Sequence, residues 1–167
     1  YTKGIPERLA AIDDLLESHP EYRGKFMFVQ VGVPSRIAIG DYAALNESLL
    51  SQVGEINAKW QTSTWRPILF VQKHMEQPAL MALHQLADFC VVSSLHDGMN
   101  LVAKEFVASR FDEDGVLILS NFTGAARELT DAELVNPFDV NELARAMHRA
   151  VTMPQEERRR RMRRMRA

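Results

Sequence analysis

The chain has 167 residues, a formal net charge of −2 and 46% hydrophobic residues, which is an ordinary composition for a globular protein. The small net charge argues against nucleic acid or an anionic membrane as the main partner. No apolar run is long enough to cross a bilayer. The single cysteine, Cys90, excludes a disulfide framework within the chain and is typical of a reducing compartment. We therefore expect a cytoplasmic protein, with residues 1–167 forming one domain.

Helices and short strands alternate along the first half of the chain. Helical spacing after Pro6 predicts a first helix that ends near His19. An almost continuous apolar run over 25–31 predicts a buried strand, followed by a loop over 32–41. The next predicted elements are a long helix over 42–59, a polar turn over 61–66, a strand over 67–71 and a helix over 78–86.

The second half continues the same alternation. Its predicted elements are a strand over 88–93, a helix over 99–110, a strand over 116–119, a turn over 121–127 and a short strand at 134–135. Asp139 is the predicted cap of a helix over 140–152. Pro154 is expected to begin a final Arg-rich helix over 154–167. Short apolar strands between helices indicate an α/β fold with a Rossmann-like, doubly wound parallel sheet.

The most informative stretch is DGMNLVAKE, from Asp97 to Glu105. It places a glycine turn and then a helix N-terminus directly after a buried strand. In open α/β sheets, ligands bind at this carboxyl edge. The free N–H groups and the dipole of a helix N-terminus favour a diphosphate, and Glu105 lies near enough to accept a hydrogen bond from a sugar hydroxyl beside it.

This stretch resembles the donor-binding signature of the trehalose-6-phosphate synthases, which are retaining glycosyltransferases of the GT-B type. The beginning of the chain, YTKGIPER over residues 1–8, resembles a second signature of that family. Members of the family carry an Arg and an Asp shortly before this signature, and the present sequence lacks both. The resemblance implies a C-terminal nucleotide-sugar-binding domain, truncated at its N-terminal edge, whose partner would be the missing N-terminal GT-B domain.

The resemblance also implies a reaction, in which glucose passes from UDP-glucose to glucose 6-phosphate with retention, giving trehalose 6-phosphate and UDP. Lys3 would contact the donor diphosphate and Asp97 the glucose hydroxyls, so these two are the expected catalytic residues. Glu105 would accept from the ribose hydroxyls. Met75 is expected near the uracil base, and Arg36 at the phosphate of the acceptor. The backbone of the turn would approach sugar and diphosphate at Gly98, Met99, Asn100, Leu101 and Val102.

Plain structural interpretations stand beside these roles. From spacing alone, Lys3 is a solvated lysine near the chain start, Asp97 a helix cap, Arg36 an exposed loop residue and Met75 a packing residue. Arg8 is interpreted as a surface or structural residue. No paired-carboxylate motif for Mg²⁺ and no glycine-rich phosphate loop are visible, so we expect donor binding without a metal or cofactor.

Three alternatives for the function remain open at this point. The chain could belong to a related glucosyltransferase with another acceptor, such as a glucosylglycerol-phosphate synthase. It could be a non-catalytic domain that binds a nucleotide sugar for regulation. It could also be an interaction domain that uses the basic run 158–166, although we expect this run to cross back toward the missing domain. Without that domain, the chain alone is expected not to catalyse efficiently.

Overall fold

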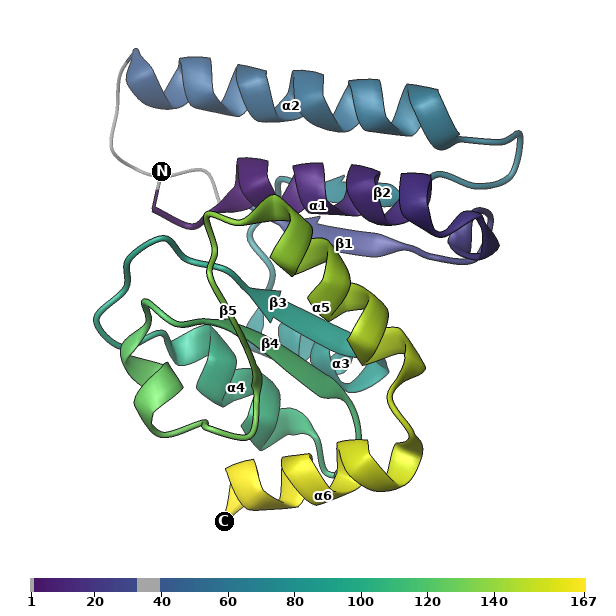
Figure 1. Ribbon diagram of the computed structural model, residues 1–167. Coiled ribbons are helices and arrows are strands. Elements are labelled where there is room, and N and C mark those ends of the chain that lie inside the picture. Colours follow the sequence, from purple (N-terminus) through teal and green to yellow (C-terminus); the bar gives the residue numbers. More distant parts are fainter. Residues whose placement is uncertain (1, 33–39) are drawn as a thin grey trace. The chain divides into compact units, whose positions relative to one another are not determined.

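The computed structural model of the protein describes residues 2–32 and 40–167 (Figure 1). Its elements are α1 (Ile5–Ser18), η1 (Pro20–Tyr22), β1 (Phe28–Val31), α2 (Asp41–Trp60), β2 (Ile68–Val71), α3 (Gln77–Leu86), β3 (Phe89–Val92), α4 (Leu101–Ser109), β4 (Val116–Ser120), η2 (Gly124–Arg127), β5 (Glu133–Val135), α5 (Val140–Thr152) and α6 (Gln155–Arg166). The chain divides into two compact units. The smaller unit comprises residues 12–75, and the larger unit comprises residues 1–11 together with 76–167.

The smaller unit contains a two-stranded parallel sheet, in which Phe28 of β1 lies opposite Ile68 of β2. Asn57 of α2 fixes the beginning of β2, because its side-chain amide donates to the Ile68 carbonyl (2.9 Å) and accepts from the Ile68 N–H (3.0 Å). The indole N–H of Trp65 donates to the carbonyl of Phe26 at 2.8 Å. The buried Asn57 contacts tie α2 to β2, and the Trp65 contact ties the turn before β2 to the segment before β1.

The larger unit contains a three-stranded parallel sheet in the order β3-β4-β5. Figure 1 shows α5 on one face of this sheet and α3 and α4 on the other. All five residues of the central strand β4 are buried, as expected for a parallel strand that is covered on both faces. Phe106 of α4 and Leu117 and Leu119 of β4 lie at the centre of the core that results.

The Arg-rich helix α6 packs on this same unit. Its Met162 is fully buried in the core beside Phe106, and Arg158 pairs with Asp114 at 2.6 Å. The hydrogen bond from Arg158 holds the pKa of the Asp114 carboxyl well below its ordinary value. Further pairs join Arg161 to Glu133, Arg163 to Glu113 and Arg164 to Asp131.

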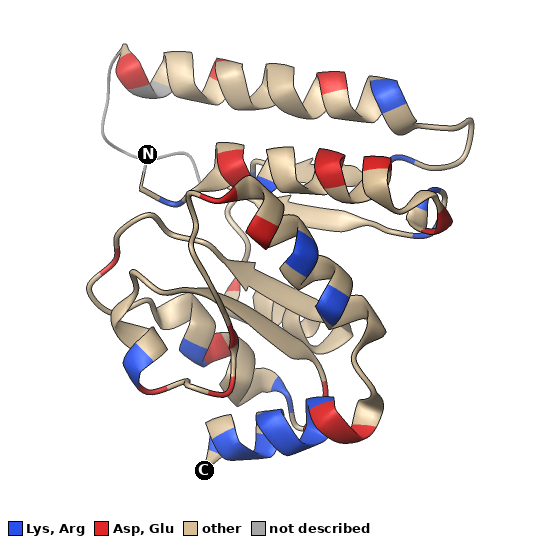
Figure 2. Cartoon of the chain, in the orientation of Figure 1, with Lys and Arg blue, Asp and Glu red and all other residues tan. Residues whose placement is uncertain are grey.

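Figure 2 shows the resulting arrangement, with the basic residues of α6 in blue and acidic residues of the same unit in red. The expectation that the run 158–166 crosses back toward the missing domain stays a prediction, and the structure shows where the helix packs on its own unit. Its buried methionine and its ion pairs hold it against its own unit. Because most of its guanidinium groups already have carboxylate partners, α6 is a poor candidate for a basic interaction surface.

The fold class predicted from the sequence is confirmed, since the chain forms an α/β fold with parallel sheets. The strands lie in two separate sheets, however, of two and three strands. The first strand begins only at Phe28, because the N–H groups of Lys25 and Phe26 bond to the Tyr22 carbonyl in a turn. Within the described residues, no helix is both long and apolar enough to cross a membrane.

Candidate functional site

The candidate site lies in the loop over 93–100, which connects the carboxyl end of β3 to α4. Its centre is held by the loop that follows β4, because the Asp97 N–H donates to the Phe122 carbonyl (3.3 Å) and the Gly124 N–H donates to the Asp97 carbonyl (3.0 Å). A Cβ atom on Gly124 would lie 2.0 Å from the Gly98 carbonyl oxygen. Only glycine allows this approach, so the loop after β4 fixes the position of the turn at Asp97 and Gly98.

The Asp97 carboxylate organises the turn and remains charged. One oxygen accepts from the Met99 N–H at 3.2 Å, and the other accepts from the Asn100 side-chain amide at 3.1 Å. The Lys3 ammonium lies 3.6 Å from the second oxygen. Partial burial acts to raise the pKa of Asp97, but the Met99 N–H, the Lys3 charge and Asn100 together outweigh it and lower the pKa. The side chain of Asp97 is 22% exposed.

Asn100 serves the loop through its side chain and adopts a left-handed backbone, with φ 66° and ψ 87°. This backbone delays the beginning of α4 to Leu101, two residues after the predicted start. The Asn100 side-chain oxygen accepts from the Ala103 N–H at 3.0 Å, and its amide donates to Ser94 Oγ at 3.4 Å. Within the described residues, the N–H groups of Leu101 and Val102 make no hydrogen bond. The positive end of α4 is therefore available to an anion.

The N-terminal segment brings Lys3 to this loop. The Leu95 N–H donates to the Thr2 carbonyl at 2.8 Å, which places the segment beside the end of β3. Gly4 has φ +68°, and a Cβ atom there would lie 2.0 Å from the Ser93 carbonyl oxygen. The two signatures found in the sequence, nearly 100 residues apart, thus meet at one edge of the larger unit.

The remaining predicted residues are placed as follows. Glu105 is half-buried on α4, and its side chain makes no hydrogen bond or ion pair with any residue that the structure describes. Burial lowers the pKa of His84, against the opposing effect of the Glu105 charge. A Cβ atom on Gly98 would meet nothing within 4 Å, so this glycine leaves open space outside the turn. Met75 belongs to the smaller unit, and Arg36 lies outside the described residues.

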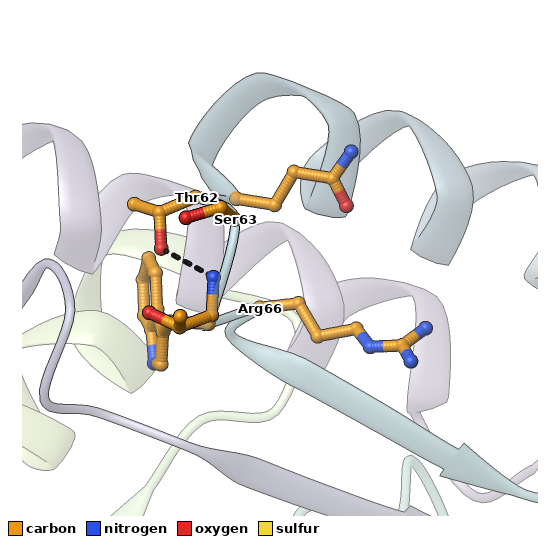
Figure 3. Close-up of a pocket in the computed structure, with 6 residues that line it drawn as sticks. Thr62, Ser63 and Arg66 are labelled. Carbon is orange, nitrogen blue, oxygen red and sulfur yellow. Dashed lines mark hydrogen bonds between the residues drawn. The ribbon is translucent and has the colours of Figure 1, made fainter.

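A surface hollow elsewhere is lined by residues 61–66, in the turn between α2 and β2 (Figure 3). The Thr64 N–H donates to Thr62 Oγ1 across it at 3.3 Å. None of the predicted site residues lines this hollow. Over 2–32 and 40–167, no group of three His, Cys, Asp or Glu residues is arranged to hold a metal ion. The loop of Asp97 remains the candidate site, because it combines opposite charges with free backbone donors.

One residue of the site was missed by the sequence interpretation. Arg8 is only 8% exposed, and it donates from Nε to Ser93 Oγ at 3.0 Å and from Nη2 to the Lys3 carbonyl at 2.9 Å. A signal for this role was present in the sequence. Side chains in the first turn of a helix point back toward its N-terminus, and the N-terminus of α1 follows Lys3 directly.

The parallel sheets define the class of the protein as an α/β fold, and this fold matches part of the solved structures of trehalose-phosphate synthases. The chain matches a Burkholderia xenovorans alpha,alpha-trehalose-phosphate synthase (UDP-forming) in complex with glucose-6-phosphate, with a TM-score of 0.96 and 42% identity over 99% of this chain and 36% of that one. It matches equally well, at TM-score 0.96 and 42% identity, a structure from E. coli bound with UDP-2-fluoro glucose, covering 99% of this chain and 37% of that one.

Residues 1–167 match glycosyltransferase family 20, and the chain belongs to that family. It is 47% identical over 158 residues to an alpha,alpha-trehalose-phosphate synthase [UDP-forming] of Aspergillus fumigatus, covering 95% of this chain and 33% of the relative. It is 45% identical over 165 residues to a bifunctional trehalose-6-phosphate synthase/phosphatase of Thermoproteus tenax, covering 99% of this chain and 23% of the relative. The chain thus spans a third or less of these relatives.

Proposed function

We propose that this chain binds UDP-glucose as the donor domain of a UDP-forming trehalose-phosphate synthase. The proposal depends on one observation above all. The Lys3–Asp97 pair, at 3.6 Å, lies at the beginning of α4, where the N–H groups of Leu101 and Val102 are free among the described residues. One small region therefore offers a cation and two amides for a diphosphate, and a carboxylate for a sugar.

Each group suits one part of the donor. The diphosphate takes the amides of Leu101 and Val102 together with the Lys3 ammonium, which stabilise the charge of the leaving UDP without a metal. The ionised Asp97 accepts from the glucose hydroxyls, and Glu105 accepts from the ribose hydroxyls. Hydrogen bonds to carboxylates are stronger than those to neutral acceptors. Met75 borders the base in this proposal.

The proposed reaction transfers glucose to glucose 6-phosphate with retention, giving trehalose 6-phosphate and UDP. In the proposal, Arg36 holds the acceptor phosphate. No side chain here is assigned as a covalent nucleophile, so the transfer takes place on one face of the sugar without a glycosyl-enzyme. The chain alone is expected to turn over poorly, because a GT-B cleft excludes water only when both domains close on the substrates.

Calorimetric titration of the full-length protein that carries this chain tests the proposal. UDP-glucose, GDP-glucose, ADP-glucose and UDP are compared with and without EDTA. We expect UDP-glucose to bind in EDTA and its binding to be lost in Asp97→Ala and in Glu105→Ala. Glu128→Gln is a matched control. Glu128 pairs at 2.8 Å with Lys104 of α4, the helix that also carries Glu105, and it has no proposed donor contact. A folded protein that binds none of the four ligands would refute the proposal.

A further inference from the structure

We propose that Arg8 is a positioning residue, whose guanidinium fixes the Lys3 backbone to the end of β3 so that the Lys3 ammonium meets the donor diphosphate. This inference rests on the proposed function, which assigns Lys3 to the diphosphate. It concerns a residue that makes no proposed contact with the ligand. The role is carried by two hydrogen bonds that Arg8 donates, at 3.0 Å to Ser93 Oγ and at 2.9 Å to the Lys3 carbonyl.

The position of Lys3 depends on its backbone, because its side chain is weakly held. That side chain is 62% exposed, and its ion-pair partner is Asp97 at 3.6 Å. An exposed pair of this kind contributes little to fixing a geometry. The backbone, in contrast, is held on both sides of Lys3. The Thr2 carbonyl accepts a hydrogen bond from the Leu95 N–H, and Gly4 lies so close to the Ser93 carbonyl that a Cβ atom on it would be 2.0 Å from the oxygen.

Arg8 adds a third attachment of the Lys3 backbone to the end of β3, which few other side chains could provide. The guanidinium is a rigid planar fork, so one group reaches the Ser93 hydroxyl and the Lys3 carbonyl at the same time. A lysine has a single nitrogen on a flexible stem and cannot reproduce both directions. Burial lowers the pKa of Arg8 to about 10, so the group is still charged at neutral pH.

A double-mutant cycle on the full-length protein tests whether Arg8 acts through Lys3. The variants are Arg8→Gln, Lys3→Gln and the double variant, with the Kd for UDP measured by calorimetry and the melting temperature measured alongside. We expect Arg8→Gln to weaken UDP binding about ten-fold when Lys3 is present, the loss expected for one charge-assisted contact. In the Lys3→Gln background the same change should weaken binding less than two-fold. Arg8→Lys should behave like Arg8→Gln.

Arg110→Gln is the matched control. Arg110 is 5% exposed and also bonds backbone carbonyls of the larger unit, including that of His84 at 2.7 Å. Its loss should lower the melting temperature and leave the Kd for UDP unchanged in both backgrounds. If Arg8→Gln fails to fold, Ser93→Ala removes only the Nε acceptor and should show the same dependence on Lys3, with a smaller loss.

The outcomes separate this inference from the proposed function. Equal losses from Arg8→Gln with and without Lys3, or full rescue by Arg8→Lys, would overturn the positioning role and leave the donor site intact. A folded wild-type protein that binds no UDP would overturn both proposals. A loss that depends on Lys3 and is absent in Arg110→Gln would support the role of Arg8, because general destabilisation cannot produce it.

Discussion

The Lys3–Asp97 pair leads to a prediction about ligand selectivity. The Lys3 ammonium lies 3.6 Å from the Asp97 carboxylate, whereas the proposed donor complex needs Lys3 at the diphosphate and Asp97 at the sugar. Replacing Asp97 by Asn removes the carboxylate that competes for Lys3, and also removes the best acceptor for the glucose hydroxyls. The variant Asp97→Asn should therefore bind UDP more tightly than the wild type and UDP-glucose more weakly.

The size of each effect follows from the geometry. At 3.6 Å, two unit charges attract by about 1 kcal/mol in water and by several times more at a protein surface. Because Lys3 is 62% exposed, the usual value for exposed pairs applies, about 1 kcal/mol or less. Release of Lys3 should thus improve UDP binding by at most about five-fold. Loss of charge-assisted bonds to the sugar costs about 1.5–3 kcal/mol, a roughly 10- to 150-fold loss for UDP-glucose relative to UDP.

Calorimetry with UDP and UDP-glucose in the same buffer measures both changes. Asparagine keeps an oxygen that can accept the Met99 N–H, so the turn should be preserved, and melting temperatures check this. Glu128→Gln, which breaks the exposed Lys104–Glu128 pair, should leave both affinities unchanged. If Asp97→Asn weakened UDP and UDP-glucose by the same factor, the carboxylate would only shape the loop, and the reasoning would be refuted.

Three further changes test other parts of the structure. Glu105→Gln should weaken UDP and UDP-glucose alike, by about ten-fold, because both ligands carry the ribose; a selective loss of UDP-glucose in calorimetry would contradict this. The folded-state pKa of Asp114 is lowered by Arg158, so its contribution is present above the unfolded carboxyl pKa and is lost as the pH falls through the folded value. Asp114→Asn should then lower stability at pH 7 by about 1–2 kcal/mol. Below about pH 4, the melting temperature of the variant should fall less steeply with decreasing pH than that of the wild type. The same pH dependence of the melting temperature in both proteins would contradict this. Gly124→Ala should cost about 1–3 kcal/mol in chemical denaturation, because its Cβ would lie 2.0 Å from the Gly98 carbonyl oxygen, whereas Gly98→Ala, with open space around it, should be close to neutral.

Much of the fold could be predicted because local patterns decide it. Apolar runs gave the buried strands, and capping residues gave helix boundaries, such as Asp139 at α5, whose side chain accepts from the Glu142 N–H. The division into two sheets was not predictable, since pairing depends on contacts between distant segments and not on the pattern within one strand. The start of α4 was missed by two residues, because no spacing rule reveals that Asn100 adopts a positive φ.

The pairing of Lys3 with Asp97 could not be predicted from the sequence. The signatures identified Lys3 and Asp97, but only the fold shows that the two side chains pair. The residues that bring the two side chains together have no proposed contact with the ligand. Gly4 and Gly124 act through the absence of a side chain, because a Cβ atom on either would lie 2.0 Å from a backbone oxygen. Arg8 acts through its buried hydrogen bonds to Ser93 and to the Lys3 carbonyl. Gly4 and Arg8 lie within the signature over residues 1–8, whereas Gly124 lies outside both signatures. A substitution of Gly124 would therefore leave both signatures readable in the sequence while moving the turn that holds Asp97, so the signatures together with Gly124 are stronger support for donor binding than the signatures alone.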